Sequence, residues 1–194
     1  DGCIIARSAE AKTLGIKMGE PYFRVKKIIR QNDIKVFSSN YALYGDISQR
    51  VMETLSGFSP DIEIYSIDEA FLGFDGFKNY ELNTYCKYMR EKIKKWVGIP
   101  VSIGLSETKT LAKIANHLAK KNPHYGGVCI LKNKSAINKA LKETAINDVW
   151  GIGRHLSIFL KRYNIRTAKD FIILDRQWIR KNMGIVGEKI YFEL

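Results

Sequence analysis

Cysteine and histidine are too few and too scattered in this chain to build a disulfide framework or a metal site. The three cysteines, Cys3, Cys86 and Cys129, are odd in number and form no Cys-x-x-Cys pair. No acid or cysteine lies at ligand spacing from the three histidines, which are expected to be structural or surface residues. The sequence therefore indicates neither a disulfide scaffold nor a zinc site, and reduced thiols of an intracellular protein are expected.

Long apolar runs and an excess of acidic residues are missing as well. No run of about 18 apolar residues is available for a membrane span, and no signal-peptide pattern is present. Walker A and Gly-x-Ser-x-Gly motifs are also absent. Instead, 32 Lys and Arg residues oppose 20 Asp and Glu residues, which gives a net charge of +12. Such a chain is expected to attract a polyanion, with nucleic acid ahead of an anionic membrane surface.

Apolar periodicity predicts an α+β chain, in which strands and helices alternate before a basic, all-helical end. We expect the boundary between these two parts near residues 130–135. The expected strands cover residues 3–6, 35–39, 62–66, 69–74, 100–104 and 128–131. The expected helices cover residues 8–18, 22–29, 41–56, 83–97, 106–121, 137–141, 146–150, 154–163, 167–174 and 175–183.

An acidic pair, Asp68 and Glu69, interrupts the apolar and aromatic run 62–72. Unpaired charge is costly to bury, so the pair needs a cation partner, a metal ion or exposure at the end of a strand. Neighbouring strand residues point to opposite faces, and both acids can serve one ion only at a hairpin tip. A magnesium site for phosphoryl transfer and a solvated turn both remain open. Asp46 and Asp75 are the candidates for a third ligand.

A glycine turn, Gly151-Ile152-Gly153, stands between two expected short helices and is followed by Arg154 and Lys161. This pattern is typical of a helix-hairpin-helix element, in which backbone N–H groups approach a DNA phosphate. Such contacts are independent of base sequence and sensitive to salt. An ordinary turn between two helices is the alternative.

A basic stripe on the expected helix 106–121 consists of Lys109, Lys113 and Lys120. Ser106 is expected to cap this helix. The simplest interpretation of the stripe is a solvated helix face.

Together these segments resemble the Y-family translesion DNA polymerases, in particular the UmuC-like branch. The resemblance covers essentially the whole chain. Its main motifs are Tyr65-Ser-Ile-Asp-Glu-Ala-Phe71, the Lys-rich run from Gly104 to Lys121, and Val149-Trp-Gly-Ile-Gly153. Further agreement lies in residues 6–12, 15–19 and 37–41.

The resemblance implies the architecture of a right-hand polymerase. Small fingers would cover residues 1–40, and a palm with an antiparallel or mixed sheet and helices would cover 41–131. An all-helical thumb with the helix-hairpin-helix element would cover 132–194.

The resemblance also assigns roles to individual residues. Asp68 and Glu69 would be two of three palm carboxylates that hold Mg²⁺, with Asp68 bridging two ions. Lys12 and Lys120 would contact the incoming nucleoside triphosphate. Ala9 departs from the family pattern, because many relatives carry a tyrosine there that bonds the triphosphate.

Parts of such an enzyme are expected to lie outside these 194 residues. Both ends resemble cuts in a longer protein. The family's first palm strand, with the third carboxylate, would precede the chain, and the little finger would follow it. Two Mg²⁺ ions are therefore expected only in the full-length enzyme, and this stretch alone is expected to be inactive.

The activity implied is error-prone translesion DNA synthesis in the SOS response to DNA damage. The implied partners are primer-template DNA, a deoxynucleoside triphosphate, a UmuD-type subunit, RecA and a sliding clamp. The implied location is the bacterial cytoplasm, at the nucleoid during repair. One alternative is a non-catalytic DNA-binding module with vestigial acids. A palm-fold nucleotide cyclase shares the carboxylates but gives no reason for the glycine turn.

Overall fold

The computed structural model describes residues 2–194 and divides the chain into two compact units, Asp1–Leu43 and Tyr44–Leu194. The first unit contains α1 (Ala9–Thr13) and α2 (Tyr22–Gln31). Ser8 caps α1 by accepting a hydrogen bond from the Ala11 amide at 3.2 Å. A small apolar cluster holds this unit together and consists of Ala11, Ile16, Val25 and Ile29.

Two strands expected from the sequence are wrong in this part of the chain. Residues 3–6 form only a single bridge, between Cys3 and Pro21, and residues 35–39 form no strand. Phe37 is 85% exposed, so its apolar side chain does not indicate a buried strand. Ile4 does exchange backbone hydrogen bonds with Gly19 and Glu20, but this contact ends after the single bridge. A short apolar run becomes a strand only where a partner continues the pairing over several residues.

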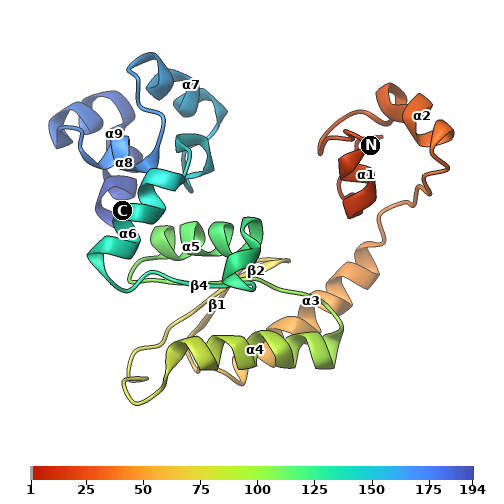
Figure 1. Cartoon of the computed structure of the whole chain (residues 1–194), viewed down its shortest axis with the longest axis horizontal. Helices are drawn as coiled ribbons and strands as arrows, with labels where there is room; N and C mark the ends of the chain where they lie inside the picture. Colours follow the sequence, from red (N-terminus) through yellow and green to blue (C-terminus); the bar gives the residue numbers. More distant parts are fainter. Residues whose placement is uncertain (1) are drawn as a thin grey trace. The chain divides into compact units, whose positions relative to one another are not determined.

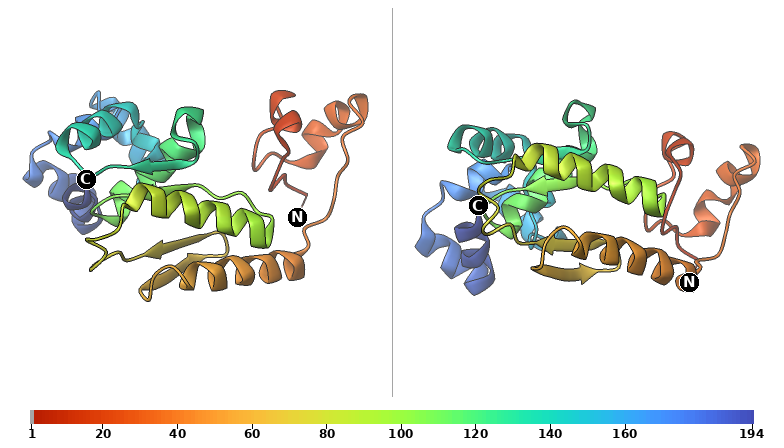
Figure 2. Two further views of the ribbon diagram at one scale, coloured as in Figure 1. Left: turned by 60° about the horizontal axis from the view of Figure 1, so that its bottom comes forward. Right: turned by 90° about the horizontal axis from the view of Figure 1, so that it is seen from below.

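The second unit is built around two separate strand pairs. β1 (Ile62–Ser66) and β2 (Glu69–Leu72) form an antiparallel hairpin, whereas β3 (Ile103–Leu105) and β4 (Val128–Ile130) are parallel. The fold is therefore α+β, as predicted, but the described strands form two separate two-stranded sheets rather than one antiparallel or mixed sheet. In both views of Figure 2, β1 and β2 run beside α3 (Tyr41–Ser56).

Helices cover the strands from two sides. Figure 1 shows α5 (Lys109–Lys121) on one side and α4 (Leu82–Val97) on the other. The α5 helix forms the crossover that a parallel pair requires. At Gly104 a Cβ would lie 2.1 Å from the Asn116 amide nitrogen, so glycine allows α5 to pack directly on β3. Among the described residues, no helix is long and apolar enough to cross a membrane.

The expected cap of α5 is wrong. The helix begins at Lys109, and Thr108 is its N-cap, with its side chain accepting from the Leu111 amide at 3.2 Å. Ser106 instead donates to the Leu131 carbonyl at 2.9 Å, which ties the end of β3 to the segment after β4. The Ser106 and Thr108 hydroxyls could both cap a helix, but the bond from Ser106 to Leu131 leaves Thr108 as the cap.

The end of the chain is helical, as predicted. It contains α6 (Lys134–Glu143), α7 (Arg154–Arg162), α8 (Ala168–Ile172) and α9 (Arg176–Glu193), which is kinked at Gly184. The helix expected at 146–150 is only a short 3-10 turn, η2 (Ile146–Asp148). Another 3-10 turn, η1 (Pro123–Tyr125), precedes β4.

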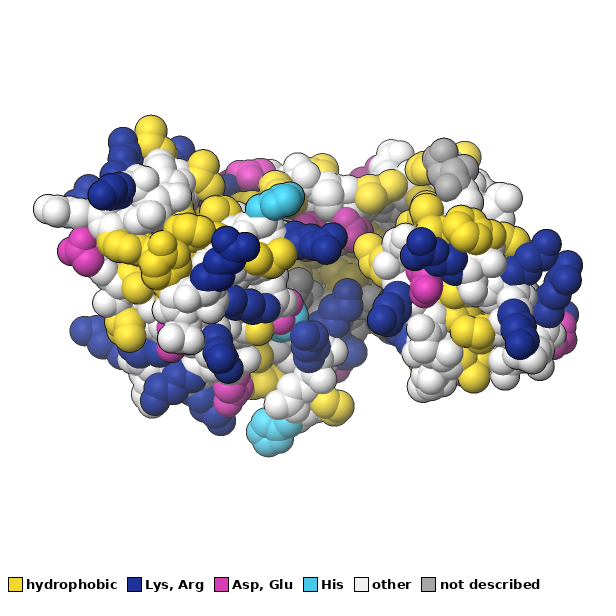
Figure 3. All heavy atoms as spheres, turned by 90° about the horizontal axis from the view of Figure 1, so that it is seen from above, with side chains coloured by type: hydrophobic (Ala, Val, Ile, Leu, Met, Phe, Trp, Pro, Cys, Tyr) yellow, Lys and Arg dark blue, Asp and Glu magenta, His cyan; other side chains and the backbone are white. Residues whose placement is uncertain are grey.

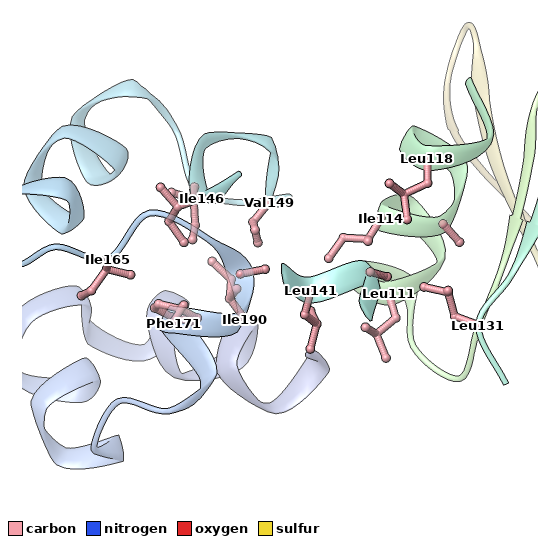
Figure 4. Packing of buried hydrophobic residues seen from close by; sticks show 14 of the residues in the cluster. Leu111, Ile114, Leu118, Leu131, Leu141, Ile146, Val149, Ile165, Phe171 and Ile190 are labelled. Atoms are coloured by element: carbon pink, nitrogen blue, oxygen red, sulfur yellow. The ribbon is translucent and has the colours of Figure 1, made fainter. Parts of the chain in front are cut away.

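One large core joins α5 to these helices. In Figure 4 the α5 side chains Leu111, Ile114 and Leu118 lie across from Leu141 and Val149. Ile114 is 1% exposed and Leu141 is also 1% exposed. The apolar face of the lysine-bearing helix is therefore anchored in this core.

Candidate active site

The acidic pair lies where the β1–β2 hairpin turns. Residues 67 and 68 form the turn, and Glu69 is the first residue of β2, paired with Ser66. Asp68 is exposed, and its Oδ1 accepts a hydrogen bond from Ser66 Oγ at 2.6 Å. The pleat is broken here, as predicted for two acids that serve one site.

A hydrogen bond fastens the turn to α3. Ser48 Oγ donates to the Ile67 carbonyl at 2.6 Å. This contact fixes the residue before Asp68 without using either carboxylate. The acid oxygens therefore keep their capacity to accept further bonds.

Two lysines of α5 meet two acids of the hairpin. Lys113 Nζ lies 2.8 Å from Glu69 Oε2, and Lys109 pairs with Glu63 one turn earlier. The Lys113 side chain is 21% exposed, whereas the Lys109 side chain is 45% exposed. The lysine stripe is thus not a solvated helix face at Lys113, whereas Lys109 pairs with an acid but stays about half exposed.

An aromatic cluster surrounds the Lys113 ammonium. It lies 4.8 Å from the centre of the Tyr65 ring and 4.9 Å from that of Trp150. Trp150 Nε1 donates to the Tyr65 hydroxyl at 3.3 Å, and the two rings meet edge to face. Phe71 completes the cluster, 5.7 Å from the Trp150 ring. The pattern of the sequence did not reveal this cluster, although Tyr65, Phe71 and Trp150 all stand within the motifs.

A cavity of about 560 Å³ opens beside the acids, between β2, β3, α4 and α5. Asp68, Glu69 and Lys113 lie on its wall. Hard carboxylate oxygens are the ligands that Mg²⁺ prefers, and Mg²⁺ commonly keeps water and substrate oxygens as its other ligands. The donor chemistry at the hairpin therefore fits Mg²⁺, with two carboxylates as a partial ligand set.

No third acid completes this set within residues 2–194. No group of three or more His, Cys, Asp or Glu side chains able to hold a metal occurs in that range. Asp46, one candidate from the sequence, pairs with Arg50 along α3 at 3.1 Å. Asp75, the other candidate, lies on the wall of the cavity.

The glycine turn leads directly into α7. Gly151 adopts φ +88°, a conformation that favours glycine, and Gly153 is the N-cap of α7. Ile152 between them is 3% exposed and anchors the turn in the core. Arg154 is exposed at the start of α7, and Lys161 near its end donates to Asn147 at 3.1 Å. The turn thus presents the N-terminus of a nine-residue helix beside basic side chains.

The two lysines expected to bind nucleotide lie on different units. Lys12 is exposed on α1 in the first unit, and Lys120 is exposed in the last turn of α5. Lys120 follows Lys113 by seven residues, which places it about 10 Å further along the same side of the helix. On the face of the second unit shown in Figure 3, Lys and Arg side chains gather more densely than acids.

The fold is that of the Y-family DNA polymerases. A Y-family DNA polymerase chimera is similar with a TM-score of 0.81 and 23% identity over 98% of this chain and 54% of that chain. A Dbh ternary complex is similar with a TM-score of 0.76 and 25% identity, over 98% of this chain and 55% of that chain.

The family model described as impB/mucB/samB matches residues 1–117, and the chain belongs to this family. UmuC of Salmonella typhimurium strain LT2 is 44% identical over the whole chain, and ImpB of Salmonella typhimurium is 42% identical. The resemblance predicted from the motifs is confirmed. The chain spans 46% of the length of each of these two relatives.

Proposed function

We propose that the protein containing this chain is a DNA-directed DNA polymerase that synthesises across damaged bases. The observation that carries the proposal is the acidic pair at the tip of the hairpin, beside a cavity and a lysine-bearing helix. Relatives at 42% and 44% identity over the whole chain, together with the polymerase fold, support the same activity. The SOS response to DNA damage is the expected setting.

In this proposal Asp68 and Glu69 hold Mg²⁺, and a third ligand comes from outside these residues. Bound Mg²⁺ supplies charge stabilisation for the attacking and leaving oxygens of phosphoryl transfer. Ser48 and Ser66 keep the turn in place while the carboxylates bind. The stretch of residues 1–194 is expected to show no polymerase activity by itself.

The remaining assignments form one consistent proposal. Residues 1–40 act as fingers, 41–131 as palm and 132–194 as thumb. Lys12 and Lys120 contact the triphosphate of the incoming nucleotide. The turn Gly151–Gly153 binds the DNA backbone as a helix-hairpin-helix element, with Arg154 and Lys161 adding positive charge. A UmuD-type subunit, RecA, a sliding clamp and a bacterial cytoplasmic location remain predictions of the resemblance.

Primer extension by the full-length protein tests the catalytic assignment. Asp68→Ala should lower extension about 100-fold or more, because metal-dependent stabilisation of the transition state is typically several kcal/mol. Asp46→Ala is the matched control, since Asp46 is an exposed acid whose ion pair, among the residues that the structure describes, is with Arg50 on its own helix. Its extension rate should stay within about twofold of the wild type, as for a surface substitution.

The rival function is a DNA-binding module without catalysis. In that case the glycine turn alone would act, the protein would bind DNA without extending a primer, and Asp68→Ala would leave DNA binding unchanged. Extension that is absent from the wild type, or unaltered by Asp68→Ala, would exclude the polymerase assignment of the acidic pair.

A further inference from the structure

Lys113 occupies a more enclosed position than the other lysine that pairs with the hairpin. Its ammonium lies 2.8 Å from Glu69 Oε2 and is flanked by the rings of Tyr65 and Trp150. The ring faces are negative, so they attract the ammonium from both sides. Glu69 is itself only 38% exposed. The lysine is therefore held in one place by three neighbours, which is uncommon for a long, flexible side chain.

Lys109 provides the contrast within the same helix. It pairs with Glu63 and lies 5.2 Å from the Phe71 ring, but both partners of this ion pair are about half exposed. Glu63 is not a member of the acidic pair at the turn. Lys109 thus contacts the hairpin away from the acidic pair, whereas Lys113 contacts an acid that is expected to bind metal.

We propose that Lys113 is a positioning residue that holds the Glu69 carboxylate while no divalent cation is bound, and that it competes with the divalent cation for this carboxylate. This role rests on the proposed function, because Glu69 must be a metal ligand for the competition to occur. The ammonium and the cation carry the same sign of charge and both need the Glu69 oxygens. Each cation therefore weakens the binding of the other.

Trp150 connects this competition to the glycine turn. It immediately precedes Gly151, and its indole contacts both the Lys113 ammonium and the Tyr65 hydroxyl. If a divalent cation bound Glu69, the Lys113 ammonium would lose its anionic partner and would be free to move relative to the indole. Binding of a cation at Glu69 would thus change the surroundings of Trp150, which stands next to the glycine turn proposed to bind DNA.

Calorimetric titration of the full-length protein with Mg²⁺ tests the competition without measuring activity. Lys113→Met keeps an unbranched stem against the rings and removes the charge. It should lower the half-saturating Mg²⁺ concentration about three- to tenfold, as for loss of one like charge in a partly exposed site. Lys113→Arg should stay within about twofold of the wild type because the charge remains.

Lys109→Met is the matched control, since it removes an equivalent charge from the same helix at the pair that does not involve Glu69. It should change Mg²⁺ binding by less than about twofold. A purely structural role for Lys113 would predict weaker or unchanged Mg²⁺ binding in Lys113→Met, and either result would overturn the proposal. If the Met variant does not fold, Lys113→Gln replaces it with the same expected direction.

A second measurement follows Trp150 directly. In a full-length background in which Trp150 is the single tryptophan left, with Trp96, Trp178 and any tryptophan outside residues 1–194 replaced by Phe, Mg²⁺ should change the emission of Trp150, and Lys113→Met should abolish this change. Glu69→Gln separates the two proposals. If Glu69→Gln binds Mg²⁺ as well as the wild type, the metal site itself is wrong. If Glu69 is required but Lys113→Met does not bind more tightly, only the competition is wrong.

Discussion

The two strand pairs of the second unit differ sharply in how they are held. In β3 and β4, Val128 is 5% exposed and Cys129 is 2% exposed, and α5 packs on both strands. In the β1–β2 hairpin, Ile64 is 61% exposed and no residue is fully buried. The β3–β4 pair is the more buried of the two, because β4 reaches the core and β3 is half-buried. In the hairpin, β2 is half-buried and the middle of β1 is exposed.

The strand pair that contributes more to the core is therefore not the pair that carries the candidate metal ligands. The exposed hairpin carries Asp68 and Glu69, and polar and aromatic contacts rather than burial keep it in place. The buried pair carries no acid but supports α5, which supplies the lysines that meet the hairpin. Acids that bind metal and substrate need access to solvent, whereas a helix that aims side chains at them needs a rigid base.

The largest expected effect lies on the buried side of this comparison. Ile114→Ala removes a 1% exposed side chain from the core of α5. The free energy of unfolding should fall by about 2–5 kcal/mol, because a large buried aliphatic group is lost and a cavity remains. Denaturant unfolding followed by circular dichroism measures this change. A loss below about 1 kcal/mol would show that the core tolerates the cavity, and it would weaken the contrast between the buried α5 side and the exposed hairpin.

A smaller effect is expected where α5 crosses β3. Gly104→Ala would place a methyl group 2.2 Å from the Ala112 carbonyl oxygen, and a backbone atom cannot move away cheaply. Unfolding should become easier by about 1–3 kcal/mol, as for overpacking. Gly45→Ala is the control, because Gly45 is inside α3 and its added Cβ would meet no atom within 4 Å beyond its chain neighbours and the backbone of its own helix. It should stabilise the protein by about 0.5–1 kcal/mol in the same denaturation experiment.

The smallest effect is expected on the exposed hairpin. Ile64→Ala makes the same chemical change as Ile114→Ala, but at a side chain that is 61% exposed. The free energy of unfolding should change by less than about 0.5 kcal/mol. A loss comparable to that of Ile114→Ala would mean that the hairpin is buried in solution and would remove the contrast.

Much of the fold follows from local patterns. Apolar residues spaced four apart predicted α3 with both of its ends, and the breaks around the acidic pair predicted the hairpin. The pattern failed for residues 3–6 and 35–39, where apolar residues lack a neighbouring strand. It also misplaced the cap of α5, because Ser106 bonds to Leu131, 25 residues away. Local patterns report what a segment can form, and a distant partner decides whether it forms.

The candidate site shows the same division. The sequence by itself determined the acidic pair at a hairpin tip, the lysines on one helix and the glycine turn, since each depends on neighbouring residues. Only the tertiary structure decided that Lys113 meets Glu69 and that Trp150 meets Tyr65, 85 positions away. These contacts join separate elements, and their geometry is set by the packing of the α5 core. No local pattern of residues records that packing.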